Sequence, residues 1–146
     1  MQSVTQLAVR LDITMLQARG IAIADEDVPD ANLPFCNPAD QLGDRLLIKY
    51  LRPDEAEKYS ILSGVSMFSG RHFVTPTPIA ARDLVSVLAL PPLGKRPCWL
   101  LLLRPEKLLA VKGPRRIQGG YGVEYVLEDG FSTLAIAEPG WVMEHR

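Results

Sequence analysis

The sequence predicts an α+β fold with a compact, mixed or antiparallel β core and two or three helices. Two observations carry this prediction: helix-like segments come early in the chain, and strand-like segments dominate its second half. The length of 146 residues is close to the usual size of one domain, so a single core is expected. A hydrophobic fraction of 47% favours a folded chain over a disordered one.

The first 43 residues differ in pattern from the rest. Residues 4–19 carry apolar side chains at a mixed spacing compatible with a short helix, which Gly20 would end. The next segment, IAIADEDVPDANLPFCNPAD, is rich in Pro, Asp and Asn and predicts an irregular loop. We therefore divide the chain into an N-terminal covering segment, residues 1–43, and an α+β domain, residues 44–146.

Apolar runs and their interruptions predict the elements of the domain. Helices are expected from Arg52 to Gly64, with Pro53 in the first turn, and over residues 79–90, which two prolines close. The last two strands are expected to form a hairpin across residues 128–130. Strands are expected at residues 46–51, 72–75, 98–103, 122–127 and 132–137.

The charge and the cysteine pattern disfavour several classes of function. A net charge of −1 and a pI of about 6.1 give no reason to expect a nucleic-acid partner. The basic segment KGPRR, residues 112–116, is the one local exception to this charge pattern, and a solvated turn is the favoured interpretation of it. Cys36 and Cys98 lie far apart, and the only histidines are His72 and His145, so no metal site is predicted.

The chain shows no membrane or secretion signal. No apolar run approaches the roughly 18 residues that a membrane helix needs. The beginning, MQSVTQLAVRLD, lacks a basic region followed by an apolar stretch. We therefore expect a soluble protein that is cytoplasmic, or that a dedicated machinery secretes without a classical signal peptide.

The glycine-rich segment QGGYGVEY, residues 118–125, is a candidate for a ligand site. Gly119 and Gly120 would let the backbone approach a ligand closely or adopt a positive φ. In the strand that follows, Val123 and Tyr125 would point one way and Glu124 the other. A carboxylate on a rigid strand beside an accessible loop is well placed to touch a sugar. A loop that enters an edge strand with an exposed glutamate is the equally open alternative.

Two more segments stand out. Lys49 lies within the apolar run LLIKYL, so its side chain must reach an edge, extend along the apolar surface to water, or face a polar cavity. In FVTPTP two prolines fix the chain just after a strand, which is also compatible with nothing more than a rigid turn.

Taken in order, these segments resemble the ADP-ribosyltransferase superfamily, especially the small toxin domains at the C-termini of bacterial polymorphic effectors. The matching stretches are KYLRPDEAEKYSILSG, FVTPTP, the run into LALPP, and GGYGVEYV, over roughly residues 44–137. The resemblance implies a split-sheet fold and cleavage of the nicotinamide–ribose bond of NAD. The family's NAD-binding arginine or histidine falls on Lys49.

The resemblance also implies roles for individual residues. Glu124 would be catalytic, orienting the ribose hydroxyls and stabilising an oxocarbenium-like transition state. ADP-ribose would pass to a macromolecule, as in other glycosyltransferases, or to water, and an immunity or antitoxin protein would be a further partner. NAD would be a substrate, and no metal is implied. The implied NAD contacts are a point charge, two rings, a hydroxyl and two glycines: Lys49, Tyr50, Phe73, Thr75, Gly119 and Gly120.

Other functions stay open or are disfavoured. A non-catalytic interaction module, or a degenerate copy on the same scaffold, is the main alternative, and the lysine at the arginine or histidine position favours it. LAVRLDITMLQARG resembles two helices of a helix-turn-helix, but an acidic loop follows instead of a basic recognition helix. No Walker loop, GxSxG elbow or HExxH helix is present.

Overall fold

The computed structural model describes residues 4–60, 67–84, 98–117, 122–137 and 143–145, and within them it confirms the α+β class. The helices are α1 (Val4–Ala18), α2 (Pro38–Leu42) and α3 (Pro53–Ser60), with short 3-10 turns η1 (Asp30–Asn32), η2 (Ala81–Asp83), η3 (Pro105–Lys107) and η4 (Thr133–Ala135). The strands are β1 (Phe35–Cys36), β2 (Leu47–Leu51), β3 (Met67–Phe68), β4 (His72–Val74), β5 (Cys98–Leu103), β6 (Val111–Arg116), β7 (Val123–Leu127), β8 (Phe131–Ser132) and β9 (Met143–His145).

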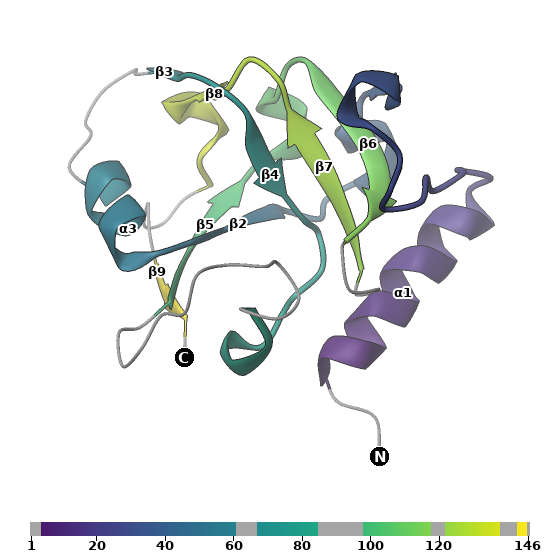
Figure 1. Cartoon of the computed structure of the whole chain (residues 1–146), viewed down its shortest axis with the longest axis horizontal. Coiled ribbons are helices and arrows are strands. Elements are labelled where there is room, and N and C mark those ends of the chain that lie inside the picture. The colour runs from purple at the N-terminus through teal and green to yellow at the C-terminus, as the bar shows by residue number, and fades with distance from the viewer. Residues whose placement is uncertain (1–3, 61–66, 85–97, 118–121, 138–142, 146) are drawn as a thin grey trace.

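The strands form two main antiparallel sheets that are joined to each other. One sheet has the order β1-β6-β7-β4 and the other β2-β5-β9, while β3 and β8 form a separate pair. The two sheets meet where Ile48 of β2 and Thr75, just after β4, exchange two backbone hydrogen bonds of 2.7 and 2.9 Å. Strands β7, β4, β2 and β5 are therefore neighbours in that order, and the bridge between Ile48 and Thr75 links the two sheets. Figure 1 shows β4, β7 and β6 side by side, with α1 beside one end of β7.

The strand register assigns the side chains to two faces. Directly opposed residues of an antiparallel pair share a face, and successive residues alternate. Val74 is opposite Tyr125, and both are buried. Their face, the core face, carries the main hydrophobic core, to which the strands contribute Leu47, Leu51, Val74, Leu101, Leu103, Val111, Val123, Tyr125 and Leu127.

The opposite face, which we call the site face, is mixed in character. Phe73 is opposite Val126, so the two share it with Glu124, two residues before Val126. Ile48 is opposite Thr75, so β2 presents Ile48 and, two residues later, Tyr50 on this same face. Next to Tyr50 a second apolar cluster forms, in which Ile79, Leu84 and Ile117 are buried and Ile48 and Leu100 pack against it.

The N-terminal segment packs on both faces. Leu16 of α1 is fully buried in the main core. Gly20, with φ +75°, follows the end of α1, as predicted. The chain then pairs with β6 at Ala24, leaves it, and returns at β1. The part between, residues 25–34, contains η1. Whether residues 1–43 fold separately from residues 44–146 stays a prediction, although the two parts share one core.

Several local predictions are confirmed, and three are wrong. The irregular loop expected at residues 21–40 contains strand β1 and the beginning of helix α2. The helix at residues 4–19 and the strands at 46–51, 72–75 and 98–103 correspond to α1, β2, β4 and β5. The helix expected from Arg52 begins at Pro53 as α3, while its expected end at Gly64 lies outside the described residues. Of the helix expected at residues 79–90, only η2 and its surroundings up to Leu84 are described.

The segment KGPRR was wrongly predicted to be a solvated turn. It forms most of β6, because Gly113 and Pro114 are accommodated by a register shift between the pairs of Lys112 and Arg115. Lys112 is opposite Val126 and Arg115 is opposite Glu124, so Lys112 and Arg115 lie on the site face. Charge and a Gly-Pro pair indicate a turn locally, but pairing with β7 overrides that preference.

The predicted hairpin between residues 122–127 and 132–137 is also wrong. Strand β7 pairs with β6 and β4, whereas β8 pairs with β3, and η4 occupies much of the second segment. The turn residues are correctly placed, since Gly130 has φ +76°. They direct the chain towards β3 instead of back along β7, which a short-range pattern does not reveal.

Gly130→Ala is expected to lower the free energy of unfolding by about 2–4 kcal/mol, because an added Cβ combines a disfavoured φ with overpacking. That atom would lie 1.6 Å from the backbone oxygen of Phe68, which belongs to β3. Gly20→Ala is the matched control: φ is +75° and nothing lies within 4 Å, so about 1 kcal/mol is expected. Chemical denaturation of both variants measures this, and equal losses would contradict the close packing at Gly130.

Candidate functional site

The beginning of β7 is fixed by its neighbours. A Cβ at Gly122, where φ is +63°, would lie 2.1 Å from the hydroxyl oxygen of Thr77, so the backbone and this side chain pack directly together. The same hydroxyl accepts a hydrogen bond from the backbone N–H of Val123 at 3.3 Å. Ile117 donates its N–H to the carbonyl of Gly122 at 3.2 Å. The backbone directly before Glu124 is therefore fixed by close packing and hydrogen bonds.

Glu124 is a largely buried carboxylate with one arginine beside it. Its side chain is 14% exposed, and Oε1 accepts a hydrogen bond from Nε of Arg115 at 2.8 Å. Burial raises the pKa of Glu124, while the hydrogen bond and the charge of Arg115 act to lower it. The alternation expected around this residue is confirmed, since Val123 and Tyr125 are fully buried on the core face.

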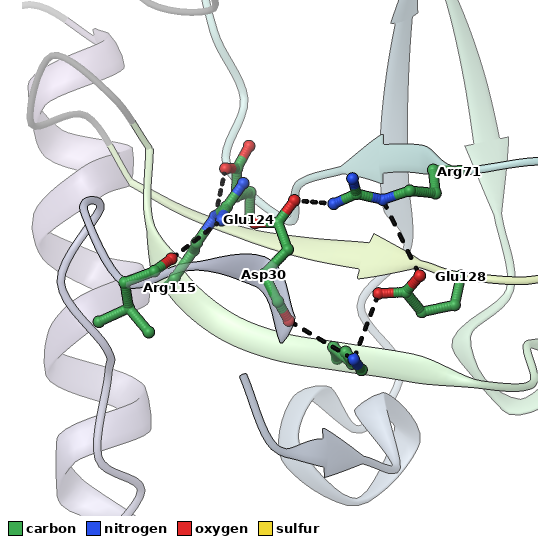
Figure 2. A network of polar contacts seen from close by, with 7 residues as sticks. Asp30, Arg71, Arg115, Glu124 and Glu128 are labelled. Carbon is green, nitrogen blue, oxygen red and sulfur yellow. Dashed lines mark hydrogen bonds and ion pairs between the residues drawn. The ribbon is translucent and has the colours of Figure 1, made fainter. Parts of the chain in front are cut away.

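A network of charges spreads from Glu124 over the site face. Figure 2 shows Asp30 between Arg71 and Arg115, with one carboxylate oxygen paired to each arginine. Lys112 and Arg71 both reach Glu128, at 3.4 and 3.9 Å. The ammonium of Lys112 also lies 3.5 Å from the backbone oxygen of Asp30. The network thus balances three cations with three carboxylates: Arg71, Lys112 and Arg115 with Asp30, Glu124 and Glu128.

Exposed aromatic rings lie beside these cations. Phe73 is 45% exposed, and the guanidinium carbons of Arg71 and Arg115 lie 5.5 and 5.7 Å from its ring centroid. At the edge of the sheet, Nζ of Lys112 lies 4.9 Å from the ring centroid of Phe35. An accessible ring flanked by two guanidinium groups is suited to stack against a flat ligand that also carries negative charge.

Glu124, Phe73, Thr75 and Tyr50 share the site face, as the register described above requires. Lys49 lies opposite Leu101 and alternates with Ile48, so it belongs to the core face instead. The structure therefore brings the catalytic candidate and three of the implied NAD contacts to one face and places Lys49 on the other. Gly119 and Gly120 lie outside the described residues.

Two of the residues on this face also hold the backbone together. The hydroxyl of Thr75 donates to the carbonyl of Val123 at 2.5 Å and accepts from the N–H of Thr77 at 3.0 Å. The hydroxyl of Tyr50 accepts from the N–H of Ile79 at 2.7 Å, and both Tyr50 and Thr75 are buried. Their roles as NAD contacts stay predictions, and their structural roles are evident.

A buried ion pair ties α1 to this region. Asp12 is fully buried; Oδ1 pairs with Arg45 without hydrogen-bond geometry, and Oδ2 accepts from the hydroxyl of Thr77. Arg45 also donates to the carbonyl of Pro76 at 2.7 Å. Because Thr77 in turn contacts Gly122 and the N–H of the next residue, α1 helps to position the beginning of β7.

Sequence reasoning missed Asp30, Arg71 and Arg115. Arg115 lies in the segment that was expected to be a turn, and only its pairing with β7 reveals its side-chain direction. Arg71 directly precedes β4 without a distinguishing pattern. Asp30 is one of several acids in a loop-like stretch, so nothing in the sequence separates it from its neighbours.

No family model, curated protein or solved structure matches this chain. Among the described residues, no group of His, Cys, Asp and Glu side chains is placed to hold a metal ion. Within the same part of the chain, no helix is long and apolar enough to span a membrane. The function of the chain must therefore be inferred from the site face itself.

Asp12→Ala is expected to lower the free energy of unfolding by about 3–5 kcal/mol, because it removes one partner of a buried ion pair. Asp44→Ala is the control: Asp44 is exposed and adjacent in sequence to Arg45, and a change within about 0.5 kcal/mol is expected. Urea denaturation at neutral pH measures both. A loss below 1 kcal/mol for Asp12→Ala would show that α1 is not anchored through this pair.

Glu124→Gln tests the environment of the carboxylate through pH. Since its pKa is raised, the folded protein holds this proton more tightly than the unfolded chain does. The resulting stabilisation is complete below the ordinary pKa and is lost as the pH rises through the folded value. Glutamine has no such titration. We expect the unfolding free energy of the variant, minus that of the wild type, to increase from about pH 4 to about pH 7. A constant or falling difference would mean that Arg115 outweighs burial.

Proposed function

We propose that this chain is an ADP-ribosyltransferase-like domain that cleaves the nicotinamide–ribose bond of NAD and passes ADP-ribose to a macromolecule or to water. The observation that carries the proposal is the position of Glu124. It is a largely buried carboxylate on a firmly held strand, directly after the glycine-rich segment. It shares its face with Phe73, Thr75 and Tyr50, three of the side chains that the resemblance assigns to NAD.

The chemistry suits a fixed carboxylate. When the bond between the anomeric carbon and the pyridinium nitrogen breaks, the electron pair returns to nicotinamide and positive charge develops on the ribose. Ionised Glu124 would stabilise that charge and orient the ribose hydroxyls. Water or an acceptor nucleophile then bonds to the anomeric carbon and loses a proton. Burial raises the pKa of Glu124, and Arg115, 2.8 Å from the carboxylate, acts against that rise and favours the ionised form.

The exposed ring of Phe73 supplies a surface for the flat part of the substrate. Stacking on a ring contributes both apolar contact and orientation. The buried hydroxyls of Tyr50 and Thr75 hold the strands from which the site is built. In this proposal Lys49 has no direct role at the reacting bond, because it alternates onto the core face.

A non-catalytic interaction module is the second candidate, and one observation favours it. Arg115 pairs with both Glu124 and Asp30, so the carboxylate is already neutralised within the protein and a segment of the chain lies over it. A carboxylate in that state would stabilise the fold without acting on a substrate. The two candidates differ in whether purified protein releases nicotinamide from NAD.

Glu124→Gln is expected to lower the turnover of NAD by about a hundred- to a thousandfold, because a neutral amide does not offset the developing charge. Affinity for NAD should change much less, since the two side chains are nearly the same size. The measurement is nicotinamide release, followed together with transfer of label from NAD to protein.

Glu106→Gln is the control for this experiment. Glu106 is an exposed carboxylate in η3, and its replacement should leave turnover unchanged. Equal turnover in the wild type and Glu124→Gln would show that Glu124 is not the catalytic carboxylate. Absence of nicotinamide release from the wild type, at saturating NAD, would favour the non-catalytic module.

A further inference from the structure

Two arginines from separate elements converge on one carboxylate of the chain itself. Asp30 gives Oδ1 to Arg115 of β6 and Oδ2 to Arg71, which directly precedes β4 (Figure 2). A carboxylate gripped through both oxygens by two guanidinium groups is also the arrangement in which proteins hold phosphate. We call Arg71 and Arg115 the arginine clamp.

The charge count shows what happens when Asp30 is absent. With Asp30 in place, three cations face three carboxylates, and the network is neutral. Without Asp30, three cations face Glu124 and Glu128, which leaves a net charge of +1 on the site face. An anion would restore the balance beside Arg115, which is 12% exposed while Asp30 is paired with it.

The segment that carries Asp30 is held mainly by polar contacts. Residues 25–32 include no buried residue, whereas Leu33, just after them, is buried. Besides the clamp, the described contacts of this segment with β6 include long hydrogen bonds of 3.5 Å from Arg115 to the carbonyl of Val28 and from Lys112 to the carbonyl of Asp30. Little apolar surface therefore opposes its displacement from the site face.

We propose that the arginine clamp is a diphosphate-binding site and that Asp30 occupies the position of one phosphate until a ligand displaces it. The ligand class is a nucleoside diphosphate or dinucleotide, with a flat ring stacked on Phe73, which lies within 5.7 Å of both guanidinium groups. This inference rests on the proposed function, in which the ligand is NAD. Arg115 belongs to the clamp and also pairs with Glu124, so a diphosphate held by the clamp would place the adjoining ribose near Glu124. The acidic segment thereby inhibits the site that it covers.

An internal competitor lowers the apparent affinity by the fraction of molecules in which the site is free. Asp30→Asn removes that competitor's charge without changing its size. Titration calorimetry with inorganic pyrophosphate should therefore show affinity at least tenfold tighter for Asp30→Asn than for the wild type. Adding Arg71→Gln to Asp30→Asn should abolish that gain, because half of the clamp is lost.

Asp27→Asn is the matched control. It removes one negative charge from the same exposed segment, in which no contact of Asp27 with either arginine is described. A gain in affinity equal to that of Asp30→Asn would show a general effect of charge and would overturn the clamp. Unchanged affinity in Asp30→Asn, or a gain that survives Arg71→Gln, would also overturn it.

A second variant keeps the test valid if Asp30→Asn does not fold. Arg71 is 46% exposed, so Arg71→Gln should fold with a nearly unchanged thermal midpoint. Arg71 also holds Asp30, but a diphosphate carries more charge than one carboxylate and loses more, so pyrophosphate binding should weaken relative to the wild type. Equal binding by folded Arg71→Gln and by the wild type would count against the clamp.

The same preparations separate this inference from the proposed function. If the pyrophosphate affinities follow the expected order but neither the wild type nor Asp30→Asn releases nicotinamide, the clamp stands and NAD cleavage falls. If nicotinamide is released but the affinities do not follow that order, NAD cleavage stands and the clamp falls.

Discussion

The short turn after β4 is the junction on which the rest of the structure depends. Thr75 exchanges backbone hydrogen bonds with β2, and its hydroxyl binds the backbone of β7. Thr77 connects the same place to Asp12 of α1 and to the N–H of Val123. Two sheets and a helix are therefore fixed relative to one another by a few buried hydroxyls, and buried hydroxyls are costly to leave unpaired. This rigidity gives Glu124 a defined position.

The sequence predicts what local rules determine. α1, β2, β4 and β5 follow from apolar runs bounded by Gly and Pro, and the opposed directions of Glu124 and Tyr125 follow from strand alternation alone. Phe73 and Glu124 were assigned to one ligand, and the register places them on one face. Pairing between distant segments is different, because it depends on which strands meet. The hairpin after β7 and the turn at residues 112–116 were therefore predicted wrongly, and Asp30 was not found.

Lys49 illustrates the limit of motif order. The family resemblance aligns it with a ligand-binding position, but a residue in a strand changes face with every step along the chain. The bridge between Ile48 and Thr75 places the neighbours of Lys49 on the site face and Lys49 itself on the other. The cations that the site face does carry come from β6 and from the residue before β4. The charge is present on this face, but it is supplied by different elements.

Arg115 couples the two halves of the site face, since it pairs with Glu124 through Nε and with Asp30 through Nη1. While Asp30 is bound, the guanidinium charge is shared between two carboxylates. When Asp30 leaves and no anion replaces it, that charge acts on Glu124 alone and opposes more strongly the burial that raises the pKa of Glu124. A diphosphate in the clamp would again share the charge of Arg115 and so weaken its effect on the pKa of Glu124. Binding at the clamp and protonation of Glu124 are thus linked, and by reciprocity a protonated Glu124 favours an anion beside Arg115.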